Sequence, residues 1–289
     1  MKHLPSLTRP ARAATVALAS AAAAAALTIP GLALAHGGHD HGHGAVPAPP
    51  AAPTSADQIQ NIDQVKTAIS AYYGDTPTNT PAPGDPTKTL HQFSPDSAYA
   101  HEVEGIAAHA GKFLAKQVHR HHGKGHFSGK PAIVFDIDDT TLNTYSYEIY
   151  SSYVFNGTTN ANFVNAGSAS VFPAVPGMLD LEAKAEAKGY TVFFLTGRPE
   201  SQRMPTEANL TYAGYDWSDA NVYLKDNTSP WLSSCQPTCS RVQYKSLTRQ
   251  HIESLGYDIV ANLGDQFSDL DGGFADRTFK IPNPMYFLP

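Results

Sequence analysis

The sequence predicts an α/β fold in which a parallel, doubly wound β-sheet is flanked by helices. Apolar stretches of strand length alternate with stretches of helical periodicity, and the three clearest strands cover residues 131–135, 190–195 and 257–263. Each of these strands ends abruptly in polar residues. Because ligands bind at the carboxyl ends of the strands in open sheets, the pattern also indicates where a functional site should lie.

Composition narrows the class of protein. The chain has 289 residues, enough for one large domain or two small ones, and 42% of them are hydrophobic, which supports a substantial core. A net charge of −6 and a pI near 6.1 argue against a nucleic-acid-binding protein, which is normally basic. After residue 35 no stretch is long and apolar enough to cross a bilayer.

Residues 1–35 have the pattern of a secretory signal peptide. Basic residues precede an Ala-rich apolar run, and Ala33-Leu34-Ala35 supplies a cleavage site before His36. The alternative is an uncleaved membrane anchor. The absence of an Arg-Arg pair favours the general export route over the twin-arginine route. We therefore expect an exported protein (secreted, periplasmic or cell-wall-associated) that has no membrane segment after cleavage.

Three groups of residues could bind transition metals, but each has a simpler explanation. Residues 36–54 form a His-rich and Pro/Ala-rich linker, and four histidines in an exposed flexible tail bind metal only incidentally. The histidines of 119–126 lie at an expected helix end, where positive charge is favoured by the helix dipole. Cys235 and Cys239 are the only cysteines, and in an exported protein we expect them to form a disulfide.

Residues 55–130 are expected to form an N-terminal helical extension. Its first helix would start near Ser55, with Ser55 or Asp57 as its N-cap. This helix places four apolar side chains on one face: Ile59, Ile62, Val65 and Ile69. Residues 74–86 are rich in Pro, Thr and Gly and are predicted to be a loop, and a second helix is predicted from about 97 to 119.

The remaining residues, 131–289, are expected to form one α/β core. Residues 143–165 are rich in Tyr, Asn and Phe and are hard to assign; their aromatic side chains could line a pocket mouth or pack on the surface. Further helices are predicted at 176–188, 200–213 and 244–256, further strands at 220–225 and 277–282, and a loop at 226–243.

The stretch that follows the first core strand carries the clearest chemical signal. Asp136 and Asp138 stand at the end of an apolar run, with Asp139 beside them. Three carboxylates at the end of a buried strand repel one another and are costly to desolvate. A cation would remove that cost, and sites built from oxygen ligands suit Mg²⁺. The simpler alternative is an acidic, solvated turn after a strand.

Four motifs in order resemble those of the haloacid dehalogenase (HAD) superfamily. They are D-I-D-D-T at 136–140, L-T-G-R at 195–198, Y-K-S at 244–246 and G-D-Q-F-S-D at 264–269. Longer stretches are similar to the branch of class B-like secreted acid phosphatases and plant vegetative storage proteins, which is HAD subfamily IIIB. They include L-T-G-R-P-E-S-Q-R from Leu195 and the tail F-K-I-P-N-P-M-Y-F-L-P from Phe279. The resemblance covers roughly residues 95–289.

The resemblance implies a site for phosphoryl transfer. Asp136 would be the nucleophile that forms an aspartyl-phosphate, and Asp138 would protonate the leaving alcohol and then deprotonate water. Lys245 would supply fixed positive charge. The residues that bind substrate would be Thr196, Gly197, Arg198 and Lys245. Mg²⁺ would be bound by Asp136, by the backbone carbonyl of Asp138 and by Asp265, with Asp269 as a direct or water-mediated ligand.

Some of these assignments have alternatives in the sequence. Lys225, also at a strand end, competes with Lys245 for the role of the catalytic lysine. Asp269 could instead be a helix N-cap. Arg198 and Arg203 could anchor substrate or could pair with local acids such as Glu200.

The expected function is that of a secreted, Mg²⁺-dependent acid phosphatase. No insertion between the motifs is long enough for a separate globular cap, so we expect a minimal cap and an open site that accepts small phosphomonoesters, unless a shared homo-oligomer surface restricts access. The alternatives are a phosphotransferase with the same motifs and a non-catalytic storage protein or metal-binding exported protein.

Overall fold

The computed structural model describes residues 49–123, 129–167 and 171–288, and it describes 119–123 as backbone only. The predicted signal peptide and the histidines of the linker therefore lie outside the described residues, as do the side chains of the second His cluster. No helix of the described part of the chain is long and apolar enough to span a membrane.

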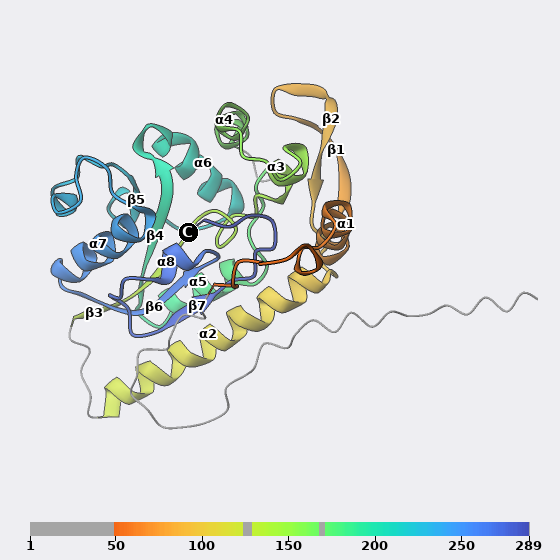
Figure 1. The fold of residues 1–289 in the computed structure, drawn as a ribbon. Helices are drawn as coiled ribbons and strands as arrows, with labels where there is room; N and C mark the ends of the chain where they lie inside the picture. The colour runs from red at the N-terminus through yellow and green to blue at the C-terminus, as the bar shows by residue number, and fades with distance from the viewer. Residues whose placement is uncertain (1–48, 124–128, 168–170, 289) are drawn as a thin grey trace, which may run out of the picture. The chain divides into compact units, whose positions relative to one another are not determined.

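A five-stranded parallel sheet forms the centre of the fold and confirms the predicted fold class (Figure 1). Its strand order is β5-β4-β3-β6-β7, and every neighbouring pair is parallel. The strands are β3 (Lys130–Phe135), β4 (Thr191–Pro199), β5 (Val222–Lys225), β6 (Tyr257–Gly264) and β7 (Thr278–Lys280). The chain builds one half of the sheet outward from β3 and then returns to add β6 on the other side of β3. This reversal makes the gap between β3 and β6 the topological switch point, where ligands bind in such sheets.

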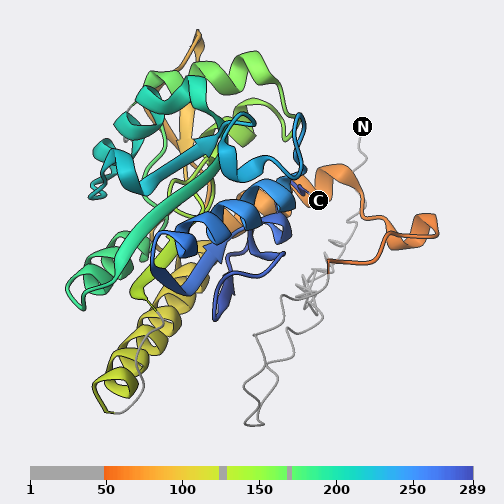
Figure 2. The same cartoon turned by 90° about the vertical axis from the view of Figure 1, so that its left-hand side faces the viewer.

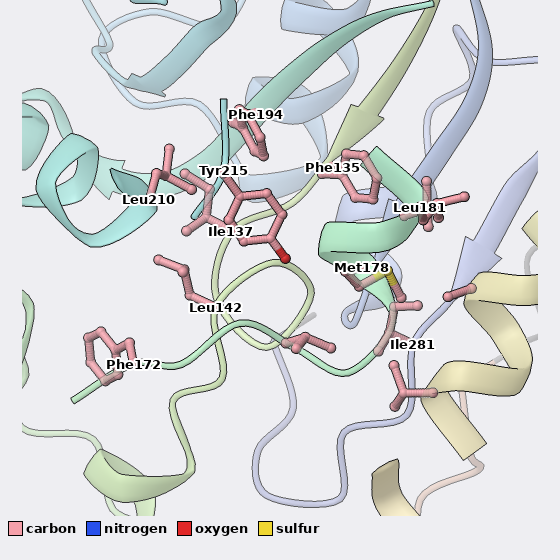
Figure 3. Packing of buried hydrophobic residues seen from close by; sticks show 14 of the residues in the cluster. Phe135, Ile137, Leu142, Phe172, Met178, Leu181, Phe194, Leu210, Tyr215 and Ile281 are labelled. Carbon is pink, nitrogen blue, oxygen red and sulfur yellow. The ribbon is translucent and has the colours of Figure 1, made fainter. Parts of the chain in front are cut away.

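Strand β3 is buried on both faces, because its side chains alternate between two hydrophobic clusters. Ile133 and Phe135 face the larger cluster, whereas Ala132 and Val134 face the smaller one. Figure 3 shows the larger cluster where Phe135 lies close to residues of neighbouring elements. This burial on both faces explains why the sequence of the strand is a continuous run of apolar residues.

Helices cover both faces of the sheet (Figures 1 and 2). Helix α2 (Ala98–Gly123) packs against β6 and against α5 (Met178–Glu186), and α5 packs against β4 over the larger cluster. Helix α7 (Arg241–Ser254) packs against β4 and β6 over the smaller cluster. Helix α6 (Arg203–Ala213) follows β4, preceded by a 3₁₀ turn at Glu200–Gln202. The two layers fix the positions of the strand ends between them.

The first helix of the N-terminal extension begins later than predicted. After a 3₁₀ turn at Ala56–Gln58, α1 covers Ile62–Tyr73, and its N-cap is Asn61 instead of Ser55 or Asp57. The Asn61 side chain accepts hydrogen bonds from the first-turn amides of α1, which sets the start of the helix. Ile59 and Ile62 are mostly exposed, so the apolar face predicted for them is not buried.

The predicted loop at 74–86 is wrong, because these residues belong to a two-stranded antiparallel hairpin (Figure 1). Its strands are β1 (Thr76–Ala82) and β2 (Asp85–Gln92), and Gly84 provides the positive φ of the turn. Proline is tolerated in such short edge strands, where not every amide needs a partner. The predicted second helix is confirmed as α2 and extends a few residues beyond His119.

The stretch at 143–165 contains two short helices, α3 (Tyr145–Tyr150) and α4 (Gly157–Ala166). Tyr145 and Tyr147 are fully buried in the core, so they do not line a pocket mouth, whereas Phe155 is exposed. A β-bridge between Leu142 and Ala174 closes the base of this insertion. The insertion therefore consists of two small helices on top of the core.

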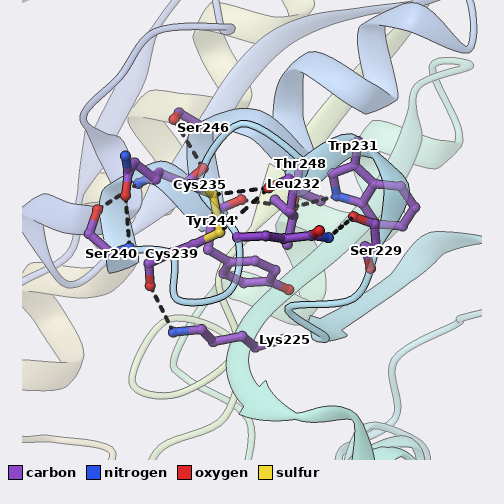
Figure 4. The surroundings of a disulfide bond; sticks show 12 residues. Lys225, Ser229, Trp231, Leu232, Cys235, Cys239, Ser240, Tyr244, Ser246 and Thr248 are labelled. Atoms are coloured by element: carbon purple, nitrogen blue, oxygen red, sulfur yellow. Dashed lines mark hydrogen bonds between the residues drawn. A yellow bond between two sulfur atoms is a disulfide. The ribbon is translucent and has the colours of Figure 1, made fainter.

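The segment before α7 is held by a disulfide between Cys235 and Cys239, as predicted (Figure 4). Helix α7 starts at Arg241, three residues before the predicted start, because Ser240 and Gln243 form a capping box. Cys239 is buried against the smaller cluster. After β6, the short helix α8 (Phe267–Leu270) precedes β7, and the chain continues as a tail at 281–288.

Candidate active site

The predicted site residues converge at the carboxyl edge of the sheet. Asp136 directly follows β3, and Asp265 directly follows the neighbouring strand β6. The two strands are in register at their ends, because the amide of Asp136 donates to the carbonyl of Leu263 over 3.0 Å. Thr196 lies in β4 on the other side of β3. Residues far apart in the sequence are thus brought to one edge by the strand order alone.

Asp136, Asp265 and Asp269 form a buried cluster of carboxylates. Each presents one oxygen, and these oxygens lie within 4.8 Å of one another, a separation at which they could hold a metal ion. Asp269 approaches this closely because residue 264 is glycine: a Cβ atom there would lie 2.5 Å from the Cβ of Asp269. Because all three donors are carboxylate oxygens, the cluster fits a hard divalent cation.

The electrostatics of the cluster also indicate that positive charge is needed there. Burial and then the neighbouring Asp269 raise the pKa of Asp136 well above its usual range. Burial and the same neighbour raise the pKa of Asp265 to about 8. A cation among these oxygens would favour the ionised carboxylates and would lower their pKa values.

Lys245 supplies one positive charge to the cluster. It lies in the first turns of α7, and its ammonium contacts Asp136 Oδ1 and the carbonyl of Leu195, with Asp269 Oδ1 at 3.2 Å. Burial by itself would lower the pKa of Lys245, but the charges of Asp136 and Asp269 outweigh it and raise the pKa. Lys225, the alternative in the sequence, instead donates to the carbonyl of Cys239 at 3.3 Å (Figure 4).

The side chain of Asp138 lies outside the carboxylate cluster and is clamped by Arg198. The Arg198 Nη2 donates to Asp138 Oδ1 over 2.6 Å, and its Nε lies 3.0–3.1 Å from both carboxylate oxygens. Arg198 is buried and also donates to Thr206, whereas the Asp138 side chain is 32% exposed. Such a two-pronged contact fixes the direction of a carboxylate.

The sequence did not decide the roles of Arg198 and Arg203, and the structure gives the two arginines different partners. Arg198 pairs with Asp138, which belongs to the predicted site, and not with Glu200. Arg203 pairs with Glu200 and Glu207, both close to it in sequence. The structure therefore brings only one of the two arginines to the candidate site.

Thr196 and Gly197 line the end of β4. The Thr196 side chain is buried, and its hydroxyl accepts a hydrogen bond from the amide of Arg198 at 3.1 Å. Gly197 is exposed, and no atom lies within 4 Å of the place that a Cβ would occupy. The strand end therefore offers open space beside a fixed hydroxyl.

Asp139, seen in the sequence only as a third acid, holds the shape of the loop after β3. It has φ of 58°, a left-handed conformation that is uncommon for a residue other than glycine. Its carboxylate accepts from the amide and hydroxyl of Thr144 and from the Tyr286 hydroxyl. Burial raises the pKa of Asp139 to about 7, although the bonds from Thr144 and Tyr286 lower it.

Sequence reasoning missed three further residues that support the site. Asn283 and Gln266 each donate an amide hydrogen to Asp265 Oδ2, over 2.7 and 2.6 Å. Arg249 is fully buried and donates to the carbonyls of Asp269, Asp271 and Gly273 in the loop after β6. The only signal in the sequence was that these residues stand inside the stretches of the family resemblance, which says nothing about their partners.

Comparison with known protein families gives a match over most of the chain. The model of the family described as "HAD superfamily, subfamily IIIB (Acid phosphatase)" matches residues 86–289.

Several curated proteins are similar in sequence. The chain is 32% identical to acid phosphatase 1 of Solanum lycopersicum over 204 residues, which cover 69% of this chain and 73% of that protein. It is 39% identical to the stem 28 kDa glycoprotein of Glycine max over 165 residues, 55% of this chain and 61% of the relative. Vegetative storage protein 2 of Arabidopsis thaliana is 32% identical over 160 residues, 54% of this chain and 56% of that protein. The match thus spans about three fifths of the length of the stem glycoprotein.

Among solved structures, the class C acid phosphatase from Bacillus anthracis with tungstate bound has a similar fold. The TM-score is 0.54 at 20% sequence identity, and the match covers 78% of this chain and 86% of that one. A second structure of the class C acid phosphatase from Bacillus anthracis gives a TM-score of 0.51 at 22% identity, over 64% of this chain and 80% of that one. These likenesses concern the fold.

Proposed function

Because the chain belongs to the HAD superfamily, subfamily IIIB, the acid phosphatase family, we propose that it is a Mg²⁺-dependent acid phosphatase that hydrolyses small phosphomonoesters. The observation that carries the proposal is the buried cluster of Asp136, Asp265 and Asp269 beside Lys245. Unpaired carboxylates are costly to bury, and their convergence at a strand edge suits a reaction that needs cations around a phosphoryl group.

In this proposal Asp136 attacks the phosphorus atom of the substrate. The phosphoryl group moves from the substrate oxygen to a carboxylate oxygen of Asp136, and water then attacks the phosphorus and releases inorganic phosphate. Covalent catalysis of this kind divides one difficult step into two easier ones. Asp136, Asp265, Asp269 and the backbone carbonyl of Asp138 would hold Mg²⁺, and the ion would supply positive charge that offsets the repulsion between the nucleophile and the phosphoryl oxygens.

Asp138 moves the protons. Its carboxyl group donates a proton to the leaving alcohol in the first step and takes one from water in the second, which restores the starting state. Two features support this role: the side chain is partly exposed, and Arg198 fixes its direction. Thr196, Gly197, Arg198 and Lys245 are the proposed contacts of the phosphoryl oxygens.

We also propose that the protein is exported. This proposal rests on the signal-peptide pattern of residues 1–35. Because the insertion after β3 contains only two small helices, we expect access to the site by a range of small phosphomonoesters.

The direct test is hydrolysis of an aryl phosphate between about pH 4 and 8, with Mg²⁺ and with chelator. Asp136→Asn should lower turnover by at least about 10³-fold, as removal of a nucleophile does. Asp180→Asn, the same change at an exposed carboxylate on α5, serves as the control and should keep full activity. Activity that survives Asp136→Asn would assign the nucleophile to another residue.

The names of some relatives support a second candidate function, since two of them are vegetative storage proteins. No turnover of the intact protein with any divalent metal would favour that function. A phosphotransferase would be recognised by a different result: added alcohols would accept the phosphoryl group in competition with water.

A further inference from the structure

The C-terminal tail, residues 281–288, reaches the candidate active site from outside the sheet. The tail is anchored at several points, because Ile281 is fully buried and Met285 nearly so. Figure 3 shows Ile281 close to Met178 of α5. Leu288 is bound through its backbone, which accepts from Ser268 and donates to Gln266. The tail therefore lies along the loop that carries Asp265 and Asp269.

Asn283 is the tail residue that contacts the metal-binding cluster. Its Nδ2 donates to Asp265 Oδ2 at 2.7 Å, while its Oδ1 accepts from the amide of Met285 at 2.8 Å. The second bond is a local turn contact that fixes which way the amide points. Pro282 and Pro284 flank Asn283 and restrict the backbone to extended conformations. The local sequence therefore orients the donor before it meets its acceptor.

Because of this contact, the two carboxylate oxygens of Asp265 have different hydrogen-bond partners. Oδ2 accepts both from Asn283 and from Gln266, so its lone pairs are engaged. Oδ1 has only a long contact, 3.4 Å from the hydroxyl of Thr140. The amide donors leave Oδ1 as the oxygen available to a cation, and partners of this kind orient metal ligands.

The tail makes a second contact with the site through Tyr286. The Tyr286 hydroxyl donates to Asp139 Oδ2 at 2.8 Å, in the loop that follows the nucleophile strand. One tail thus touches both loops that supply the carboxylate cluster, the loop after β3 and the loop after β6. A segment that bridges two ligand-bearing loops affects their separation.

We propose that Asn283 is a positioning residue for the metal site, and that docking of the C-terminal tail and binding of the cation stabilise one another. The inference rests on the proposed metal site. Binding free energies are reciprocal, so a tail that favours cation binding must itself be held more firmly when the cation is bound. The tail then contributes to the affinity of the site for the cation.

The first test measures Mg²⁺ binding to the full chain by calorimetry. Asn283→Ala should weaken binding by about 10- to 100-fold, the usual cost of losing a partner of a metal ligand. Phe287→Ala changes an exposed residue of the same tail and should leave binding unchanged.

A milder variant keeps the test decisive if Asn283→Ala does not fold. Tyr286→Phe removes a single hydroxyl and should weaken Mg²⁺ binding by about 2- to 10-fold, the worth of one hydrogen bond. In both variants kcat at saturating Mg²⁺ should recover toward the wild-type value, because a positioning residue acts through metal affinity.

The reciprocal effect is measured by hydrogen exchange of the C-terminal peptide. The amides of Met285 and Leu288 are hydrogen-bonded, so Mg²⁺ should slow their exchange in the wild type and should have no effect on it in Asp265→Asn. Wild-type protein that does not bind Mg²⁺ would refute the proposed metal site. Equal Mg²⁺ affinity in wild type, Asn283→Ala and Tyr286→Phe would instead overturn the role of the tail and leave the proposed function intact.

Discussion

Lys245 is the residue on which the carboxylate cluster depends most. Its ammonium is buried between Asp136 and Asp269, so each of the three groups compensates for the burial of the others. Removing one member of such a buried group leaves charge without a partner, which costs more than an exposed ion pair would contribute. The lysine therefore has a structural role in addition to its proposed role in binding phosphate.

Lys245→Met should lower the free energy of unfolding by about 3–5 kcal/mol at pH 8 in the presence of chelator. The loss should be smaller at pH 5. The charge of Lys245 lowers the pKa of Asp136, so its removal raises that pKa further above the value in the unfolded chain, and the variant loses more stability than the wild type as the pH rises. Urea unfolding at both pH values measures this, with Lys225→Met as the control that should show no such pH dependence. An equal loss at pH 5 and 8 would argue against the electrostatic explanation.

Glu148, which lies outside the carboxylate cluster, is a second buried carboxyl group with a raised pKa. It lies on α3, one turn after Thr144, and is 7% exposed. Among the described residues none donates a hydrogen bond to its carboxyl group. Burial, and then the charges of Asp139 and Asp138, raise the pKa of Glu148 to about 8. At neutral pH the folded protein therefore keeps this carboxyl largely protonated.

Glu148→Gln should be more stable than the wild type at pH 9, and the difference should disappear near pH 4. In the unfolded chain Glu148 ionises near its ordinary pKa of about 4.3, so folding binds a proton between that pKa and about 8. Wild-type stability falls across this window, and glutamine, which does not titrate, avoids the fall. Chemical unfolding at several pH values measures the effect, and Glu104→Gln, at an exposed site of α2, should show no trend. A constant difference at all pH values would contradict the prediction.

At the scale of the element, α7 connects the cluster to the loop after β6. Lys245 and Arg249 stand one turn apart, on the same face of the helix. The first contacts Asp136 and the second binds three carbonyls of the loop that carries Asp269. The start of α7 is set by the capping box of Ser240, so the cap also sets the position of Lys245.

Ser240→Ala should lower the free energy of unfolding by about 1 kcal/mol, the usual cost of losing an N-cap. Turnover should fall little, because Lys245 is also held by its charged partners and by the packing of α7. Ser218→Ala is a matched control, since Ser218 precedes a 3₁₀ turn but makes no side-chain cap bond. Thermal and urea unfolding of both variants measure the contrast, and equal losses would mean that the cap of α7 contributes nothing specific.

At the scale of the whole molecule, the N-terminal extension is part of the core. Tyr73 of α1 stacks on Tyr99 at 4.2 Å and on Tyr145 at 4.5 Å between ring centroids. Tyr99 in turn accepts a hydrogen bond from Asn143, close to the loop after β3. The extension therefore supports the base of the site.

Deletion of residues 36–54 should leave turnover and Mg²⁺ affinity unchanged, because the residues of the candidate site lie between 136 and 286. Deletion of residues 36–95 should abolish folding, since it removes α1 and the β1–β2 hairpin and exposes the stacked tyrosines. Circular dichroism and turnover distinguish the two deletions. A large loss of activity on removing 36–54 alone would point to a working role for the histidines of the linker.

The sequence by itself determined the class of fold and the place of the site. The apolar runs of the core, each ending in polar residues, are local patterns, and the rule that parallel strand ends share one edge turns them into a prediction about distant residues. For this reason Asp136, Thr196 and Asp265 could be assigned to one edge before any contact between them was known, and the family resemblance added Lys245 to them. The pairing of Cys235 with Cys239 was predictable for a different reason: they are the only two cysteines of a chain that is expected to be exported.

Only the tertiary structure decided which partner each group takes. Arg198 stands near Glu200 in sequence but binds Asp138, 60 positions away, and Asp265 receives its orienting bond from Asn283 in the tail. The hairpin at 76–92 forms on a Pro-rich stretch because β2 packs against α3. In each case the free energy comes from burial and hydrogen bonds between segments far apart in the chain. Helix and strand propensities depend on neighbouring residues in the sequence and do not reflect such contacts. For that reason the contacts could not be predicted from the sequence.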